Sequence, residues 1–441
     1  MIYFFVGIKG AGMSALAQIL KELGYEVEGS DKPDHFFTEQ PLIDKGIKIY
    51  EFNKDNITKN MTIVQGNTYK DDHEEIIKAK ELGLKIYSYQ EMVSRLTTMF
   101  KTITIAGCHG KTTTTSMLAH VFDNIKGCNY LIGDGTGHGS KDNEYFMLEA
   151  CEYKRHFLSY HPYYAIITNI ELDHIDYYKD IDDIVMAYQE YARLAEKMVI
   201  ACGDDPYTHT LDVNVPIFYY GLNEDNDIIA KEVEFSNDGT SFDVYVEDNY
   251  YGHFDLPLYG KHILLNALAV IGICYFENIE KEEVYKYLST FAGAKRRFKE
   301  TTIVSSVIID DYAHHPTEVK SVICAAKQKY LDKKIIVIFQ PHTFTRTKKF
   351  SKLLADSLNE ADVSYVMPIH PARESQIDYP DVTSDLIVDN LENGFNIDID
   401  DAEILNQYDN AVFIFMSPND ISKLEKSLIS LKEFSDKGKS L

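Results

Sequence analysis

The sequence predicts an α/β protein of three domains. At 441 residues the chain is too long for one hydrophobic core, so more than one domain is expected. Short apolar, β-branched runs alternate with helix-period stretches along most of the chain, which is typical of sheets covered by helices. Two of the apolar runs end in glycine-rich turns, near residues 7 and 107, and a helical stretch follows each turn. We expect two doubly wound units on either side of a nucleotide-binding unit.

The first domain is expected over residues 1–97 and is predicted to be Rossmann-like. Ile2–Val6 is an apolar strand, and Gly7-Ile8-Lys9-Gly10-Ala11-Gly12 then leads into a helical stretch and a second strand. This order is typical of dinucleotide-binding βαβ units, although the glycines fall as G-x-x-G-x-G. Asp31 stands where an acidic residue would meet a ribose hydroxyl. Tight packing of helix on strand is the alternative explanation of the glycines.

The central domain, residues 98–298, is predicted to be a P-loop-type ATPase domain with a mixed sheet. The strand Ile103–Ala106 ends in the loop Gly107-Cys108-His109-Gly110, and Lys111-Thr112-Thr113 opens a helix. Loop amides and a helix N-terminus bind phosphate oxygens; Lys111 would reach the β- and γ-phosphates, and Thr112 would ligate Mg²⁺. A chance glycine turn is the alternative. It would not explain why a strand precedes the loop and Gly-Lys-Thr opens the helix. The sequence therefore predicts binding of a nucleoside triphosphate.

Polar residues follow two further predicted strands of this domain. Glu149 follows the strand at 145–148, and a polar segment containing His174 follows the strand at 165–168. Open α/β sheets place ligands at the carboxyl ends of strands, and phosphoryl transfer needs side chains that position metal ions. Glu149 and His174 are thus candidate metal ligands. A solvated turn with a helix cap is the alternative for the second segment.

Two other segments leave alternatives open. His262 and Asn266 are four residues apart on a long apolar helix, so they share one face of it. Adenine recognition and a buried asparagine satisfied by the backbone both fit this spacing. Arg296 and Arg297 precede the third domain, where an arginine pair could clamp a transferring phosphate or form a solvated basic turn.

The third domain, residues 299–441, is predicted to be a second Rossmann-like unit. Four apolar strands alternate with helical stretches at 316–329, 346–358 and 421–431, and polar segments close three successive strands. These segments are Asp310-Asp311-Tyr312-Ala313-His314-His315-Pro316-Thr317-Glu318, Phe339-Gln340-Pro341-His342-Thr343-Phe344-Thr345-Arg346-Thr347 and His370-Pro371-Ala372-Arg373-Glu374. Together they predict a ligand cleft. We expect the acidic connection 393–401 to be a surface loop and the tail after Phe434 to be frayed.

The composition excludes several classes of partner. A net charge of −25 argues against nucleic acid, whose phosphates require excess Lys and Arg. The six cysteines are scattered without a C-x-x-C pair, as in reduced cytosolic proteins. No signal peptide and no apolar run of about 18 residues is seen, so we expect a cytoplasmic protein without a membrane partner, either monomer or dimer.

Taken together, these motifs resemble those of the Mur ligases over essentially the full length. The similarity rests on GIKGAGMSALA at Gly7, GCHGKTTTT at Gly107, EACE at Glu149, NIELDHIDYY at Asn169, AKRRF at Ala294, DDYAHHPTEV at Asp310 and FQPHTFTRT at Phe339. The paired DDYAHHP and FQPH segments are most similar to the alanine-adding branch. Three departures stand out: Thr343 replaces a frequent arginine, Ile263 replaces a frequent asparagine, and Met416-Ser417-Pro418-Asn419-Asp420-Ile421 replaces a glycine-bearing loop.

The resemblance implies an ATP-dependent, ADP-forming carboxylate–amine ligase of peptidoglycan precursor synthesis. It implies that L-alanine is joined to the carboxylate of UDP-N-acetylmuramate through an acyl phosphate. The N-terminal domain would bind the UDP-sugar, the central domain ATP, and the C-terminal domain the amino acid while closing over ATP. Two rivals remain: a recycling ligase that attaches a preformed peptide to the same UDP-sugar, and a non-catalytic nucleotide-binding regulator.

The resemblance also implies roles for individual residues. The expected catalytic residues are Lys111, Glu149, His174 and Arg297. The expected ATP contacts are Gly107, Cys108, His109, Gly110, Lys111, Thr112, Thr113, His262, Asn266, Arg297 and Asp311. The expected UDP-sugar contacts are Gly7, Gly10, Gly12, Met13, Ser14 and Asp31, and the expected amino-acid contacts are Tyr312, His342 and Arg346. Thr112, Glu149 and His174 would hold two Mg²⁺ ions, with Mn²⁺ able to replace them, and one of His314, His315 and His342 would be the base.

Overall fold

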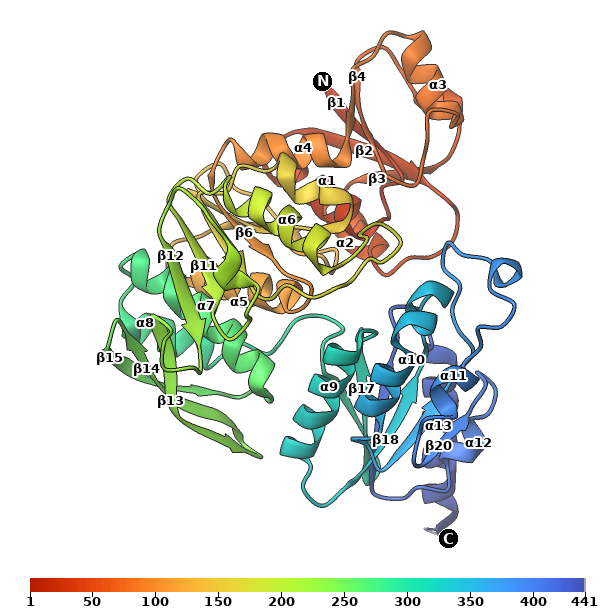
Figure 1. The fold of residues 1–441 in the computed structure, drawn as a ribbon. Helices are drawn as coiled ribbons and strands as arrows, with labels where there is room; N and C mark the ends of the chain where they lie inside the picture. The colour runs from red at the N-terminus through yellow and green to blue at the C-terminus, as the bar shows by residue number, and fades with distance from the viewer. Residues whose placement is uncertain (440–441) are drawn as a thin grey trace. The chain divides into compact units, whose positions relative to one another are not determined.

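The structure, a computed structural model, describes residues 1–439 (Figure 1). Three sheets with helices against their faces confirm the predicted three-domain α/β fold. The chain forms two compact units, and the first unit contains residues 1–231, 243–254 and 265–291. The second unit contains residues 232–242 and 255–264 and the chain from residue 292 onward. The expected domain limits, at residues 97 and 298, stay a prediction.

The first sheet is parallel throughout, in the order β3-β2-β1-β4-β5. Its elements are β1 (Ile2–Val6), α1 (Ala11–Glu22), β2 (Glu26–Asp31), α2 (Glu39–Asp44), β3 (Lys48–Glu51), η1 (Lys54–Asn56), β4 (Met61–Gln65), α3 (Glu74–Glu81), β5 (Ile86–Ser88) and α4 (Tyr89–Thr97). Successive residues of β1 face opposite cores: Phe5 packs with residues of α1 and α4, and Phe4 and Val6 pack with residues of α3. This strand order with both faces covered is the predicted Rossmann-like arrangement, whose ligand site lies beyond the carboxyl end of β1.

The central sheet has the order β15-β14-β13-β12-β11-β10-β6-β9-β7-β8, and it is mixed as predicted because β8 runs antiparallel to β7. Its strands are β6 (Lys101–Ala106), β7 (Asn129–Leu131), β8 (Gly137–His138), β9 (Tyr145–Glu149), β10 (Tyr164–Ile167), β11 (Met198–Cys202), β12 (Ile217–Gly221), β13 (Ile228–Ser236), β14 (Gly239–Val246) and β15 (Asn249–Leu256). Its helices are α5 (Lys111–Ile125), η2 (Tyr153–Ser159), α6 (Ile181–Ala192), η3 (Thr208–Thr210), α7 (Lys261–Phe276) and α8 (Lys281–Leu288).

The register of the central sheet brings three predicted site segments to one edge. Strand β6 pairs in parallel with β9, which places Ile105 beside Glu149, and with β10, which places Ala106 beside Ile167. The phosphate loop after β6, the carboxylate that ends β9 and the polar segment after β10 therefore lie at adjacent strand ends.

The third sheet has the order β16-β17-β21-β18-β19-β20, parallel except for β16. Its strands are β16 (Lys299–Ile303), β17 (Ser306–Asp311), β18 (Lys334–Phe339), β19 (Val363–Val366), β20 (Gly394–Asn396) and β21 (Ala411–Met416). Its helices are α9 (Pro316–Lys329), α10 (Phe344–Leu358), η4 (Gln376–Asp378), α11 (Asp385–Val388), α12 (Ala402–Leu405) and α13 (Ser422–Lys439).

Two expectations for the third domain are corrected. Residues 394–396 form the edge strand β20 within the segment expected to be a surface loop. The surrounding acidic residues hid this short strand, because an edge strand needs little apolar sequence. The tail after Phe434 is helical as far as Lys439, and residues 440–441 lie outside the described residues.

Within residues 1–439, no helix combines the length and the apolar character needed to cross a bilayer. All six cysteines are free.

Candidate functional site

The loop between β6 and α5 has a backbone that only glycine can supply at two positions. Gly107 has φ of 147°, and a Cβ added there would lie 1.8 Å from Thr168 Oγ1. Gly110 has φ of 85° and is the N-cap of α5. Glycine is therefore required by both conformation and space, as the phosphate-loop prediction supposes.

Residues at the end of β10 fix this loop from one side. Asn169 Oδ1 accepts a hydrogen bond from His109 N at 2.9 Å, and Asn169 Nδ2 donates to His109 O at 2.9 Å. Thr168 Oγ1 donates to the same carbonyl at 2.5 Å. Sequence reasoning selected His174 from this segment and assigned no role to Thr168 or Asn169. Their place directly after a buried strand was the available signal.

Lys111, the first residue of α5, is held by oxygen atoms on two sides. Its ammonium donates to Gly107 O and, at 3.2 Å, to Cys108 O. It also lies 3.1 Å from Glu152 Oε1 and 3.0 Å from Glu152 Oε2. Burial acts to lower the pKa of Lys111, but the Glu152 carboxylate outweighs it and keeps that pKa above its ordinary value.

Glu152 joins Lys111 to His174. His174 Nε2 lies 3.1 Å from Glu152 Oε1, and the Glu152 side chain is only 1 % exposed. Burial acts to raise the pKa of Glu152, yet Lys111 and His174 hold it below its ordinary value. The carboxylate of Glu149, the other predicted metal ligand, accepts a hydrogen bond from Gly133 N at 2.8 Å. Sequence reasoning missed Glu152 because the chain turns irregularly after β9.

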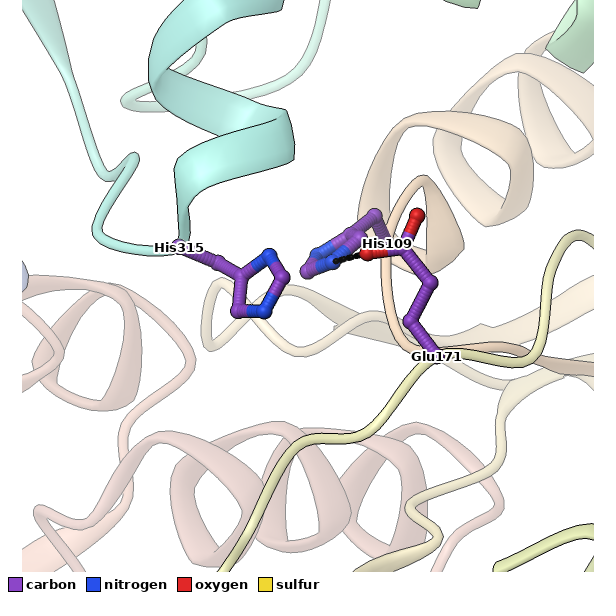
Figure 2. A group of neighbouring side chains, drawn as sticks. All are labelled: His109, Glu171 and His315. Carbon is purple, nitrogen blue, oxygen red and sulfur yellow. Dashed lines mark ion pairs between the residues drawn. The ribbon is translucent and has the colours of Figure 1, made fainter. Parts of the chain in front are cut away.

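A second ion pair lies on the phosphate loop (Figure 2). His109 Nε2 is 3.3 Å from Glu171 Oε2, and the Cys108 thiol donates to Glu171 O at 2.9 Å. Burial raises the pKa of Cys108 well above its ordinary value, so this cysteine is a thiol at neutral pH. His315, also labelled in Figure 2, belongs to the second unit, where its N–H donates to Glu318 at 3.3 Å at the start of α9.

The first domain has a cavity of about 390 Å³ at the carboxyl end of β1. Its lining residues are Gly7, Gly10, Ala11, Gly12, Met13, Asp31, Lys32, Phe36, Gly66, Asn67, Thr68, Tyr69 and Tyr89. Five of the six predicted UDP-sugar residues are among them. The sixth, Ser14, is fully buried away from the cavity and donates to Thr38 O at 3.1 Å, because it lies on the inner face of α1.

Asp31 organises the turn that borders this cavity. Its carboxylate accepts hydrogen bonds from Lys9 N at 2.7 Å, Lys32 N at 2.8 Å and the Tyr69 hydroxyl at 3.1 Å. The acid predicted to meet a ribose hydroxyl therefore already holds three protein groups.

The asparagine of α7 lies against the phosphate loop. Asn266 Oδ1 is 2.8 Å from the point where a Cβ on Gly110 would stand. Asn266 is buried, and its Nδ2 has no hydrogen-bond partner among residues 1–439. The alternative of an asparagine satisfied by the backbone thus fails for this nitrogen, which favours a ligand contact. His262, at the start of the helix, has its pKa lowered to about 4 by burial and by Arg297.

In the second unit, Asp311 is a buried acid at the end of β17. Its carboxylate accepts from Phe298 N at 2.7 Å and Ala313 N at 2.8 Å, and Arg297 Nη1 lies 3.9 Å away. Burial raises the pKa of Asp311 to about 6, against the opposing effect of Arg297. Arg297 also lies 3.5 Å from Glu318. The predicted pair Arg297 and Asp311 is therefore brought together.

The strand ends after β18 and β19 place imidazoles beside an arginine. His342 stacks on His370 with ring centroids 5.8 Å apart, and His342 Nδ1 is 3.3 Å from Arg346 Nη1. Burial and the neighbouring cationic groups lower the pKa of His342 to about 3, so the ring is neutral at pH 7. The Glu374 carboxylate accepts from Phe344 N at 2.6 Å and Thr345 N at 3.0 Å, which occupies the N-terminus of α10.

Side chains also anchor the altered loop at 416–421. Arg296 donates to Ser417 O at 3.1 Å and Asn419 O at 3.3 Å. Gln340 Oε1 accepts from Ser417 Oγ at 3.0 Å and from Asn419 Nδ2 at 3.3 Å. Tyr312 lies under Arg296 and Arg297, at 5.4 and 5.3 Å from its ring centroid. The loop at 416–421 is thus held by polar contacts from Arg296 and Gln340.

Three family descriptions match successive parts of the chain. The Mur ligase family catalytic domain matches residues 3–101, the Mur ligase middle domain matches residues 105–274, and the Mur ligase glutamate ligase domain matches residues 296–417.

Solved structures match over the whole length. UDP-N-acetylmuramate–alanine ligase of Thermotoga maritima is 26 % identical, with 99 % of this chain and 100 % of that chain covered and a TM-score of 0.80. A murein peptide ligase of Psychrobacter arcticus is 24 % identical, with 98 % of each chain covered and a TM-score of 0.71. A MurF ligase of Thermotoga maritima in complex with ADP is 16 % identical, with 96 % and 99 % covered and a TM-score of 0.63.

Proposed function

Because the chain belongs to the Mur ligase family, a family of ATP-dependent ligases that form amide bonds, we propose that it joins L-alanine to the carboxylate of UDP-N-acetylmuramate. The observation that carries this substrate choice is the full-length similarity to the alanine ligase of Thermotoga maritima, at a TM-score of 0.80. The DDYAHHP and FQPH segments support the same choice. We place the reaction in the cytoplasm, in peptidoglycan precursor synthesis, and leave monomer and dimer open.

The reaction has two steps. A carboxylate is a poor acyl donor, so its oxygen first attacks the γ-phosphorus of ATP, and ADP leaves as the acyl phosphate forms. The amine nitrogen of alanine then attacks the acyl carbon, and phosphate leaves as the amide forms. We assign Lys111 and the backbone amides of residues 107–110 to the phosphates of ATP, and Asn266 and His262 to its adenine.

The residues predicted to hold Mg²⁺ fit that ion. The Thr112 hydroxyl and the Glu149 carboxylate supply oxygen donors, and His174 follows the adjacent strand β10. When bound, Mg²⁺ draws charge from the phosphates during transfer. We assign two ions to the site, with Mn²⁺ able to replace them.

The amino acid is placed on the third sheet. Glu374 already accepts from the first N–H groups of α10, so the carboxylate of alanine is assigned to the Arg346 guanidinium, beside Tyr312 and His342. The attacking amine must lose a proton. With a pKa of about 3, His342 is too weak a base, which leaves His314 and His315.

The test is substrate-dependent phosphate release. Purified protein with ATP and UDP-N-acetylmuramate should release phosphate when L-alanine is added and little without it. The similarity to a murein peptide ligase over 98 % of the chain makes a peptide-adding ligase the second candidate. Faster release with the tripeptide L-alanyl-γ-D-glutamyl-meso-diaminopimelate than with L-alanine would overturn the proposal in favour of that reaction. No release with either amine would support the nucleotide-binding regulator.

A further inference from the structure

The mechanism proposed above gives no role to Glu152, a buried carboxylate of the central domain. Glu152 lies beside the phosphate loop with its side chain 1 % exposed, and it contacts both Lys111 and His174. Burying a carboxylate is unfavourable unless charged partners compensate for the lost water, so these contacts hold its charge in place.

The contacts of Lys111 show what nucleotide binding must change. An ammonium has three N–H donors, and those of Lys111 face Gly107 O, Cys108 O and the Glu152 carboxylate. A phosphate oxygen can take one of these donors only by displacing an oxygen already there. Displacing Glu152 relieves the repulsion between two anions, whereas displacing a carbonyl leaves that repulsion in place.

Displacement of Glu152 leaves a buried anion with His174 as its remaining named partner. That state is unfavourable unless a cation arrives together with the phosphates. We propose that Glu152 is a positioning residue that holds Lys111 in the nucleotide-free enzyme and makes tight nucleotide binding depend on an accompanying divalent cation. The inference rests on the proposed assignment of residues 107–112 to the phosphates of ATP.

The test compares ADP affinity in a chelator with ADP affinity in excess Mg²⁺, measured by calorimetry on the full chain. Glu152→Gln keeps the shape and removes the charge, so metal-free ADP should bind at least about fivefold more tightly than to the wild type. Affinity in Mg²⁺ should change much less, so the ratio between the two conditions should fall. A merely structural residue would not tighten binding when altered.

Glu277→Gln is the matched control. Glu277 is also a largely buried glutamate paired with a lysine, Lys197 at 3.0 Å, and it accepts hydrogen bonds from Tyr145 and Tyr164. It directly follows α7, eleven residues beyond Asn266 in the sequence. Its variant should lower the melting temperature and leave the ratio of ADP affinities unchanged.

Unchanged or weaker binding of metal-free ADP to folded Glu152→Gln would overturn the inference. If that variant does not fold, Glu152→Asp replaces it, because a carboxylate one methylene shorter cannot contact both Lys111 and His174. Tighter metal-free binding than in the wild type would support the inference, and wild-type affinity would overturn it. Wild-type protein that binds no ADP in either condition would overturn the proposed function as well. Failure of the Glu152 inference alone is therefore distinguishable, because the wild-type protein would then still bind ADP.

Discussion

The carboxyl ends of the central sheet and of the third sheet both carry many polar side chains. They differ in the group that lies beside the basic residue of each site. In the central sheet, Lys111 is paired with the buried Glu152, which also contacts His174. In the third sheet, Arg346 lies beside His342, whose lowered pKa of about 3 keeps it uncharged at pH 7. Lys111 thus has a carboxylate partner, and Arg346 has a neutral imidazole among its neighbours.

The difference indicates what each edge can bind. A site whose cation is already compensated favours an anion that brings its own cation, as a metal–triphosphate does. A guanidinium beside a neutral imidazole favours a small bare anion such as a carboxylate, which it can bind through two hydrogen bonds. The two edges are therefore expected to respond differently to substitution.

The largest effect is expected at Lys111. Lys111→Ala removes the charge that bears on the transferring phosphoryl group, so kcat for phosphate release should fall about a thousandfold or more. Binding of UDP-N-acetylmuramate, measured by calorimetry, should remain near normal because the residues predicted to contact it line a cavity of the first domain. Lys126→Ala, an exposed position just after the same helix, is the control. Wild-type turnover in Lys111→Ala would refute the phosphate-loop assignment.

A smaller and different effect is expected at Arg346. Arg346→Lys keeps the charge but loses the planar fork, so KM for L-alanine should rise roughly 10- to 100-fold. KM for ATP should stay within about twofold, since we assign ATP to the central sheet and L-alanine to the third sheet. Lys349→Ala, on the exposed face of α10, should leave both constants unchanged. An unchanged KM for L-alanine would mean that Arg346 does not bind the carboxylate of L-alanine.

The helices and strands could be predicted from the sequence because the spacing of apolar residues determines where they form. β1 begins and ends as predicted, and α9 does as well, since an apolar run and an N-terminal proline define their ends. Helix α10 begins at Phe344, two residues before the predicted start, because Thr343 caps it: Thr343 Oγ1 accepts a hydrogen bond from Arg346 N. Such a cap depends on the conformation of the preceding loop, which periodicity does not report.

The carboxylate that partners His174 was less accessible to sequence reasoning. Glu149 and Glu152 belong to the same short motif, and the position at a strand end favoured Glu149. In the structure, residues after Glu152 form an irregular turn with positive φ at Lys154 and Arg155. Glu152 stands just before that turn and contacts Lys111 and His174, and no propensity rule predicts such a backbone conformation for these residue types. Side-chain contacts that depend on an irregular backbone could therefore be found only in the structure.

The smallest effect, and a direct test of the neutral ring, is expected from His342→Asn. The pKa of His342 is about 3 in the folded protein against an ordinary value of 6.5, so between these values the unfolded chain binds more protons. The free energy of unfolding therefore falls as pH drops from 6.5 toward 3, and removing the imidazole should make that fall shallower. Because the ring is partly exposed, we expect less than about 1 kcal/mol of difference between pH 6.5 and 4.5 in urea unfolding. His35→Asn, whose ring is 83 % exposed, is the control for the loss of an imidazole. An unaltered slope in His342→Asn would mean that the ring is charged when folded, and the contrast between the two edges would then fail.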